Sequence, residues 1–233
     1  MAADGATGRR RGPSLSSEDA ALDQKRAAAY AAVELVKDGM RVGLGSGSTV
    51  AEFLPALAER GCTGLRCVAT SPATERVARE LGLEVEPLDA VGELDVAIDG
   101  ADEIDPSGWL IKGGGGAHTR EKIVVAAARR FVVIASANKA VAKLDGPVPL
   151  ELLSFGVNHT LAALAPARLR DVPRSPDGGL IADYMGPVGD PRELARRLAE
   201  TPGVIEHGLF APEMVSDILI AGETGVEHRA GAK

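Results

Sequence analysis

The stretch that decides the fold is RVGLGSGST, residues 41–49. Its apolar start predicts a strand over Arg41–Gly45, and the amphipathic pattern of Thr49–Arg60 predicts a helix directly behind it. Gly45 and Gly47 lie between the two, where glycine lets the backbone turn tightly and approach a ligand closely. A strand that enters a helix through such a turn is the first half of a βαβ unit.

The same alternation of strand and helix patterns continues to about residue 135. Helices are expected at 18–37, 49–60, 73–81 and 119–130, and strands at 41–45, 65–70, 84–88, 94–99 and 131–135. This alternation predicts an α/β fold with a Rossmann-like, mainly parallel sheet and helices on both faces. Ligands of such sheets bind at the carboxyl ends of the strands.

A second pattern begins near residue 146. Strands at 149–155, 180–185 and 204–210 alternate with helices at 160–169 and 190–200, an order that suits a small ferredoxin-like α+β unit. A last strand at 214–220 can return to the first sheet. We therefore expect a disordered tail at 1–16, a Rossmann-like catalytic domain at 17–144 and 210–233, and a small α+β domain at 145–209.

The composition excludes several classes of protein. The 233 residues carry a net charge of −7 with one Trp, two Tyr and four Phe, whereas a nucleic-acid surface needs basic patches and aromatic rings. No apolar run approaches the roughly 18 residues of a membrane span, and no apolar segment follows the early arginines as a secretory signal requires. Cys62 and Cys67 lack the spaced partners of a zinc site. We expect a cytoplasmic protein that binds neither nucleic acid nor membrane.

Residues Ser46 to Thr49 form a hydroxyl-rich loop that suits a small phosphate ester. The free N–H groups at the start of the following helix favour an anion. A nucleotide P-loop needs a lysine before Ser48, and a dinucleotide fingerprint needs a glycine at that position; the chain has neither. The alternative interpretation is a tight turn that binds no ligand.

Four acids in a short segment follow an apolar run: Asp99, Asp102, Glu103 and Asp105. They repel one another unless a ligand, a cation or a lysine lies among them. Three interpretations stay open at this point: a Mg²⁺ site, a set of carboxylates that bind sugar hydroxyls and move protons, and a solvated acidic turn.

The third motif is a run of four glycines, Gly113–Gly116, directly behind Lys112. Such a run is costly in entropy, which favours a backbone that closely approaches a ligand. Thr119 is expected to cap the next helix, with Glu121 in its first turn. A first-turn acid often only complements the helix dipole, yet beside Lys112 and the acidic segment it is a candidate base. His118 is interpreted as a loop or capping residue.

Together these motifs resemble the type A ribose-5-phosphate isomerases, from about Asp23 to the C-terminus. The matching segments are Gly45–Thr49, Asp99–Glu103, Lys112–Gly115 and Thr119–Lys122. The resemblance implies a reversible isomerisation of D-ribose 5-phosphate and D-ribulose 5-phosphate, in the non-oxidative pentose phosphate pathway, without a cofactor or a metal. It further implies that the partners are a small sugar phosphate and further copies of the chain, in a homodimer or a homotetramer.

Carried over by position, the resemblance makes Glu121 the proton-transferring base. Asp99 would assist ring opening, Asp102 would orient sugar hydroxyls, and Lys112 would stabilise the developing oxyanion. The residues implied to contact the substrate are Ser46, Gly47, Ser48, Thr49, Asp99, Gly100, Ala101, Asp102, Lys112, Gly113, Gly114 and Gly115, with Lys139 and Lys25 as further phosphate contacts.

Two positions depart from the family pattern: Ser46 stands where a threonine is common, and His118 stands where an apolar residue is expected. Two other functions stay open. A sugar-phosphate-sensing module would keep the phosphate loop without needing Glu121 and Lys112 together. A related isomerase or transferase of the same fold, such as an amino-sugar phosphate isomerase or an acyl-CoA transferase, would rearrange the acidic segment and the glycine run.

Overall fold

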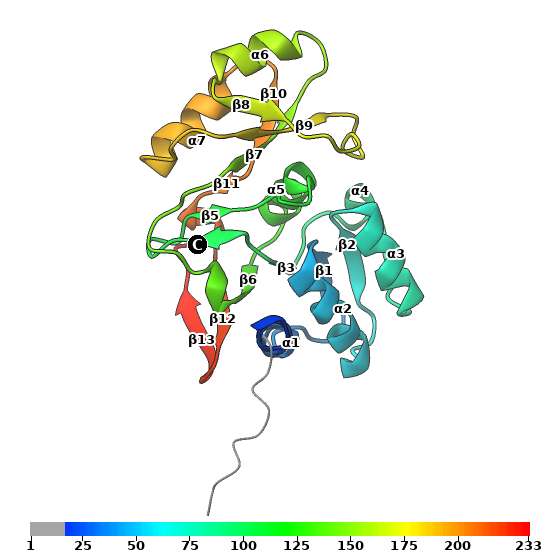
Figure 1. Ribbon diagram of the computed structural model, residues 1–233. Helices are drawn as coiled ribbons and strands as arrows, with labels where there is room; N and C mark the ends of the chain where they lie inside the picture. The colour runs from blue at the N-terminus through cyan, green and yellow to red at the C-terminus, as the bar shows by residue number, and fades with distance from the viewer. Residues whose placement is uncertain (1–16) are drawn as a thin grey trace, which may run out of the picture.

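A six-stranded sheet forms the centre of the computed structural model, which describes residues 17–233; the tail expected at 1–16 lies outside these residues. Its strands are β1 (Arg41–Leu44), β2 (Arg66–Ala69), β3 (Val96–Asp99), β6 (Phe131–Ser136), β12 (Asp217–Gly222) and β13 (Gly225–Ala230). Their spatial order is β13-β12-β6-β3-β1-β2, and neighbours are parallel except β12 and β13 (Figure 1). The predicted mainly parallel sheet is confirmed.

Helices cover both faces of this sheet, as the alternation predicts. They are α1 (Ser17–Val33), α2 (Ser48–Arg60), α3 (Pro72–Glu80), α4 (Leu88–Val91) and α5 (His118–Ala126). Successive residues of a strand point to opposite faces, and the apolar clusters follow this rule. Ile134 of β6 packs in the core beneath α1 and α2, whereas its neighbours Val133 and Ala135 pack in the core beneath α5. Burial on both faces explains the continuous apolar sequence of β6.

A second sheet lies at the top of Figure 1, beyond α5. Its strands are β7 (Val148–Leu152), β8 (Ala167–Leu169), β9 (Leu180–Tyr184) and β10 (Val204–His207), antiparallel in the order β10-β7-β9-β8. With α6 (Val157–Ala163) and α7 (Pro191–Glu200) the chain order is β-α-β-β-α-β, the ferredoxin-like arrangement. We call residues 148–207 the small sheet unit. A three-stranded ribbon joins it to the centre, in the order β11 (Leu209–Phe210), β5 (Leu110–Ile111) and β4 (Glu103–Ile104).

Three helices are shorter than the sequence predicts. The helix expected at 160–169 ends before Pro166, because proline cannot continue a helix and disfavours helical backbone at the preceding residue; β8 takes up the rest. The helix expected at 119–130 ends at Ala126, where the chain turns to make backbone hydrogen bonds with Leu94. α1 also ends before its expected boundary.

Two expected strands are interrupted. The strand expected around Val85 is reduced to an isolated bridge, since Pro87 lacks the N–H group of a ladder and the chain enters α4. The strand expected at 204–210 divides into β10 and β11 at Gly208, where a Cβ would overlap the carbonyl oxygen of Lys112. The Lys112 N–H donates to the Gly208 carbonyl at 2.8 Å, so this close approach fixes the backbone of Lys112.

The C-terminal segment returns to the central sheet, as the sequence predicts. The short helix η2 (Pro212–Met214) takes up the start of the expected strand, and β12 then pairs with β6 in parallel. On the other edge of β6, β3 completes the pairing. β6 is therefore an inner strand, with a neighbour from earlier in the chain on one edge and the C-terminal β12 on the other.

Other expectations from composition can be compared with residues 17–233. No helix in this range is long and apolar enough to cross a membrane. Cys62 and Cys67 are both free thiols. Burial raises the pKa of Cys67 to about 12, which leaves it an unreactive core residue.

Candidate active site

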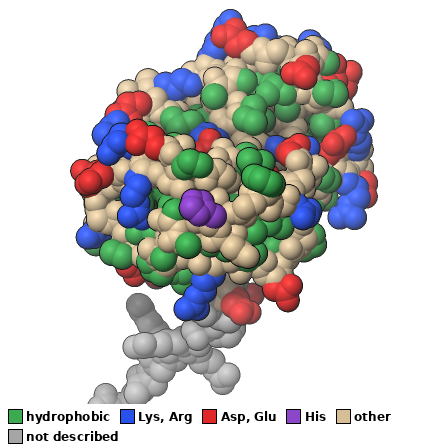
Figure 2. Space-filling model, turned by 90° about the horizontal axis from the view of Figure 1, so that it is seen from above, with side chains coloured by type: hydrophobic (Ala, Val, Ile, Leu, Met, Phe, Trp, Pro, Cys, Tyr) green, Lys and Arg blue, Asp and Glu red, His purple; other side chains and the backbone are tan. Residues whose placement is uncertain are grey.

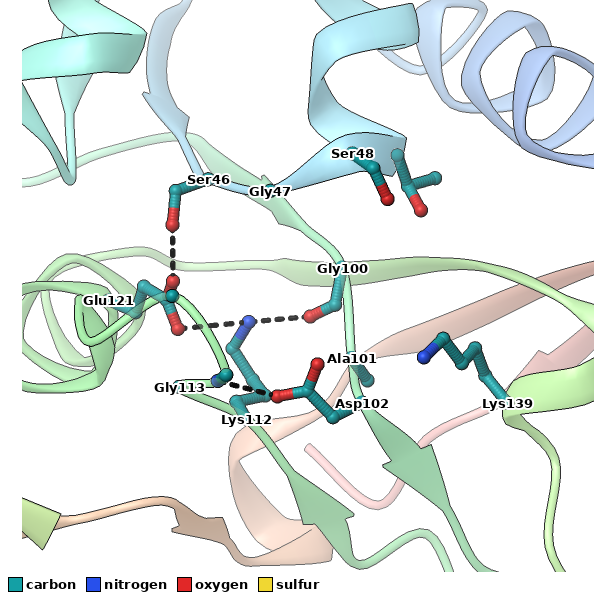
Figure 3. Close-up of a pocket in the computed structure, with 13 residues that line it drawn as sticks. Ser46, Gly47, Ser48, Gly100, Ala101, Asp102, Lys112, Gly113, Glu121 and Lys139 are labelled. Carbon is teal, nitrogen blue, oxygen red and sulfur yellow. Dashed lines mark hydrogen bonds and ion pairs between the residues drawn. The ribbon is translucent and has the colours of Figure 1, made fainter. Parts of the chain in front are cut away.

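The three sequence motifs meet at the carboxyl ends of β1 and β3, where an α/β sheet places its ligands. They line a pocket with a cavity volume of about 100 Å³. The pocket is lined by Ser46, Gly47, Ser48, Thr49, Gly100, Ala101, Asp102, Lys112, Gly113, Gly114, Gly115, Glu121 and Lys139 (Figure 3). All of these residues belong to the predicted set. Asp99 is buried behind the lining, and Lys25 lies on α1 outside it, where its phosphate contact stays a prediction.

Two glycines shape the first loop. A Cβ at Gly45 would overlap the Asp99 carboxylate, and Gly47 has a φ of +91°, which side chains disfavour. Gly47 is the N-cap residue of α2, so Ser48 and Thr49 face the pocket together with the first N–H groups of that helix. This arrangement suits an anionic group such as a phosphate.

Lys112 lies between two carboxylates beneath the pocket. Its Nζ is 2.9 Å from Asp99 Oδ2 and 3.2 Å from Glu121 Oε2, and it donates to the Gly100 carbonyl at 2.5 Å. The three charged side chains are at most 5% exposed. Two carboxylates around one ammonium leave an excess of negative charge in a region of low dielectric constant.

Burial and the neighbouring charges together set the protonation of this cluster. Burial, followed by the neighbouring Glu121 carboxylate, raises the pKa of Asp99 to about 7, although Lys112 opposes the shift. Burial alone would lower the pKa of Lys112, but the two carboxylates outweigh it and raise that pKa above its usual value. Lys112 is therefore charged at neutral pH, while Asp99 can both accept and donate a proton there.

Ser46 contacts both carboxylates. Its hydroxyl donates to Glu121 Oε1 at 2.5 Å (Figure 3). Its backbone N–H donates to Asp99 Oδ1 at 3.0 Å. Since Glu121 Oε2 lies near Lys112, the Glu121 carboxylate is held from two sides. The sequence predicts Ser46 only as a substrate contact, because nothing local links residues so far apart in the chain.

The opposite side of the pocket carries hydroxyl and ammonium groups. Figure 3 shows Ser48 and Lys139 on the side away from Glu121. Lys139 comes from η1 (Ala137–Lys139), directly after β6. Asp102 lies between the two sides, where its Oδ2 accepts from the Gly114 N–H at 2.8 Å. The pocket therefore has an anionic side suited to proton transfer and a polar, cationic side suited to a phosphate.

Thr119 does not cap the helix, so that prediction is wrong. The N-cap residue of α5 is Ala117, and it makes no side-chain cap. The Thr119 hydroxyl donates instead to Glu151 in β7, whose other oxygen accepts from Ser175. The carboxylate of Glu151 thus ties the helix that carries Glu121 to the small sheet unit.

His118 differs from the expected loop or capping residue. It is the fully buried first residue of α5 and packs against Gly113, where a Cβ would lie 2.6 Å from His118 Nδ1. Burial lowers the pKa of His118, which leaves the ring neutral at ordinary pH. Its contact with Gly113 explains why the first residue of the glycine run carries no side chain.

The acidic segment is not a carboxylate cluster of the kind that binds a cation. Asp99 pairs with Lys112, and Asp102 accepts from the glycine loop. Glu103 and Asp105 accept backbone hydrogen bonds elsewhere. Within residues 17–233, no group of three or more His, Cys, Asp or Glu is placed to hold a metal ion. Each of these carboxylates has a different partner. Residues that are close in sequence therefore do not form one carboxylate cluster here.

Sequence reasoning assigned no chemistry to the small sheet unit, yet two of its residues reach the site. Glu151 bonds to α5, and Arg170 donates to carbonyl groups of the glycine loop. Glu151 could have been found from the sequence, because it is the one acid in the apolar run 148–152 and a buried acid needs a partner. Arg170 lies among other charged residues, and no local pattern distinguishes it.

Comparison with known proteins bears on this geometry. Residues 66–225 match the family described as ribose 5-phosphate isomerase A (phosphoriboisomerase A). This chain belongs to that family. The ribose-5-phosphate isomerase A of Caulobacter vibrioides is 48% identical over 219 residues, which cover 88% of this chain and 96% of that protein. The resemblance drawn from three loops therefore extends over most of the chain.

Solved structures of ribose-5-phosphate isomerases share this fold. Ribose 5 phosphate isomerase A from Neisseria gonorrhoeae superposes with a TM-score of 0.87 at 32% identity, covering 91% of this chain and 98% of that one. A D-ribose-5-phosphate isomerase in complex with phospho-erythronic acid superposes with a TM-score of 0.84 at 35% identity, covering 89% and 98%. The predicted family and fold class are confirmed.

Proposed function

We propose that the pocket interconverts D-ribose 5-phosphate and D-ribulose 5-phosphate, with Glu121 as the base that moves the proton between C2 and C1. The observation that carries these roles is the position of Glu121: a buried carboxylate on the pocket wall, held by Ser46 and Lys112. Membership of the isomerase family supports the reaction, and the geometry supports the assignment of residues to its steps.

The phosphate binds at the side of the pocket away from Glu121. Ser48 and Thr49 hold it with the N–H groups at the start of α2, and Lys139 supplies a positive charge. Lys25 on α1 is a further phosphate contact in this proposal. This end of the substrate does not change during the reaction, so its binding energy orients the sugar carbons.

Ring opening uses Asp99. The furanose opens when the anomeric hydroxyl loses its proton, its oxygen forms the C1 carbonyl, and the ring oxygen leaves C1 and takes up a proton. A carboxyl group with a pKa near neutrality suits such an exchange, since it accepts a proton readily and returns it readily. Asp102 orients the sugar hydroxyls.

Proton transfer follows in the open chain. Glu121 takes the proton from C2, the C–H electron pair forms the C1=C2 double bond, and O1 becomes negatively charged. A proton then moves from O2 to O1, the C2 carbonyl forms, and Glu121 returns its proton to C1. Lys112 and N–H groups of the Gly113–Gly115 loop stabilise the oxygen atoms of this ene-diolate.

The test is an isomerase assay on the purified chain. Ribose 5-phosphate is added with EDTA present, and ketose formation is followed. We expect ketose to form despite the chelator and phospho-erythronic acid to inhibit competitively, because its planar carboxylate shares negative charge between two oxygens as an ene-diolate does. Absence of ketose from ribose 5-phosphate would contradict the proposal.

We further propose a cytoplasmic homodimer or homotetramer in which the small sheet unit contributes a subunit contact. Phe155 is 92% exposed and Leu153 is 52% exposed, and both follow β7. Seen from that end of the molecule, groups of apolar side chains lie among charged ones (Figure 2). The domain boundaries 17–144, 145–209 and 210–233 belong to the same proposal. Light scattering coupled to size exclusion tests the oligomer, and a monomer would contradict it.

A further inference from the structure

A salt bridge in the small sheet unit aims a guanidinium group at the active site. Arg170 directly follows β8, and Asp183 lies in the adjacent strand β9. Arg170 Nε and Nη2 donate to the two carboxylate oxygens of Asp183 at 2.7 and 2.6 Å. The side chains are 18% and 17% exposed. A bidentate pair of this kind fixes the plane of the guanidinium as well as its position.

The remaining nitrogen of Arg170 reaches the glycine loop. Nη1 donates to the Gly114 carbonyl at 2.8 Å and to the Gly113 carbonyl at 3.2 Å. Residues of this loop also line the pocket. One side chain from the small sheet unit therefore holds two consecutive peptide groups of the active-site wall.

Because the peptide unit is planar, the bonds from Arg170 to the two carbonyl groups also fix the direction of the next N–H groups. In a trans peptide the C=O of one residue and the N–H of the next point in opposite directions. With the Gly113 carbonyl bound to Arg170, the Gly114 N–H points away from Arg170, and it donates to Asp102 at 2.8 Å. With the Gly114 carbonyl bound as well, the Gly115 N–H is turned away from Arg170 in the same manner.

Glycine makes such an anchor necessary. A run of four glycines has more backbone freedom than any other four residues, so ordering it costs more conformational entropy. Donors stabilise a developing negative charge effectively only when they are already oriented before the reaction. Arg170 adds to the Gly114 contact with Asp102 and to the turn that joins the Gly116 N–H to the Gly113 carbonyl, and it contacts the loop from the side of the small sheet unit.

We propose that Arg170, held by Asp183, is a positioning residue that turns the Gly115 N–H toward the reacting oxygens of the substrate and keeps the Gly114 N–H on the Asp102 carboxylate. The proposal rests on the isomerase function proposed above. The small sheet unit thereby takes part in catalysis through the backbone of the central domain, without touching the substrate.

The test compares Arg170→Ala and Arg170→Lys with Arg174→Ala. Arg174 is a matched control, because it lies in the same loop between β8 and β9. It is an exposed arginine whose Nη1 donates to the Gly178 carbonyl. We expect kcat of Arg170→Ala to fall about 10- to 100-fold with KM changed less than about threefold, since loss of an oriented donor acts in the transition state. Arg170→Lys should lose less, and Arg174→Ala should stay within about twofold of the parent protein.

Chemical rescue separates positioning from a merely structural role. Guanidinium chloride at low millimolar concentration should restore kcat of Arg170→Ala about fivefold or more, whereas sodium chloride at equal ionic strength should not. The affinity for phospho-erythronic acid should fall in parallel with kcat. The proposal is overturned if Arg170→Ala behaves like Arg174→Ala, or if a folded Arg170→Ala protein loses kcat that guanidinium does not restore. An inactive parent protein would instead reject the proposed function.

Discussion

Glu121 and Lys122 are consecutive residues of α5, yet they belong to two clusters of opposite character, the first buried and the second half-buried. Glu121 faces the pocket, where it shares Lys112 with Asp99. Lys122 faces the small sheet unit, where its Nζ donates to Glu206 and to the His207 carbonyl, both at 2.7 Å. The two ammonium groups lie over the same Phe210 ring, 5.5 and 4.9 Å from its centre.

The difference between the clusters lies in their charge balance. Around Lys112 two carboxylates compete for one ammonium, and the pKa of Asp99 rises to about 7. Around Lys122 one carboxylate matches one ammonium; burial opposes the ionisation of Glu206, but Lys122 outweighs it and lowers that pKa. An unbalanced cluster exchanges protons near neutral pH, whereas a balanced one only joins two parts of the fold. We therefore expect substitutions around Lys112 to act on rate and those around Lys122 to act on stability.

The largest effect is expected for Glu121→Gln. This substitution keeps the shape of the side chain and removes the base, so kcat should fall by about 10²–10⁴ while the melting temperature changes by only a few degrees. Steady-state kinetics with ribose 5-phosphate and a thermal melt provide the measurement. A variant with a kcat within tenfold of the parent protein would disprove the assignment.

The next test exchanges each lysine for a methionine of similar volume. Lys112→Met removes the charge that stabilises the ene-diolate, so kcat should fall by about 10²–10³ with a smaller change in KM. Lys122→Met breaks a half-buried pair and should destabilise the fold by roughly 1–3 kcal/mol while kcat stays within about threefold. If the two variants lose activity equally, the comparison fails.

The pH dependence of the rate tests the unbalanced cluster. Because ionised Asp99 accepts the proton of the anomeric hydroxyl, kcat/KM should rise with pH through about 7 and level off above it. Asp99→Asn should lose this rise together with most of the activity, whereas Asp102→Asn should retain the rise at a lower rate. Initial rates between about pH 5.5 and 8.5 provide the profile. A profile of the parent protein without a change near pH 7 would contradict the role of Asp99.

The smallest effect concerns stability in acid. Burial, and then Lys122, lowers the pKa of His207 from 6.5 to about 4. The unfolded chain therefore binds a proton there more readily than the folded one, and the stability from neutral His207 is complete above about pH 6.5 and lost as the pH falls toward 4. His207→Asn should reduce the acid-induced loss of unfolding free energy by about 1–3 kcal/mol, measured with urea at neutral pH and near pH 4.5. Equal losses in both proteins would show that His207 titrates normally.

The parts of the site that the sequence predicts share a local cause. Glycine-rich loops such as Gly113–Gly116 indicate that the backbone approaches another group closely. This signal is local, because it does not depend on which distant segments pack against the loop. Alternating apolar runs likewise predict the parallel sheet, since period and length are local properties. Thr119 shows the limit: at the start of a helix its hydroxyl is expected to cap, but Glu151 from a distant strand takes the hydroxyl instead.

The parts that the sequence misses depend on contacts between distant segments. The Ser46 hydrogen bond to Glu121 joins residues separated by 75 positions, and the bond from Arg170 to Gly114 spans 56. Neither residue differs in type from neighbours that have no such partner. The pattern also misplaces element boundaries where a proline, as at Pro166, or a tertiary backbone pairing overrides a favourable helical pattern.

The close approach at Gly208 also determines when the site can first exist. The backbone of Lys112 is held by a residue that is synthesised 96 positions later, as 208 − 112 gives, and no side chain fits between the two. A nascent chain that ends before residue 208 contains β1, β3 and the phosphate loop. It lacks the Gly208 carbonyl that accepts the hydrogen bond from the Lys112 N–H. Activity should therefore appear abruptly as the last strands emerge from the ribosome, so an unfinished or truncated copy would be catalytically silent.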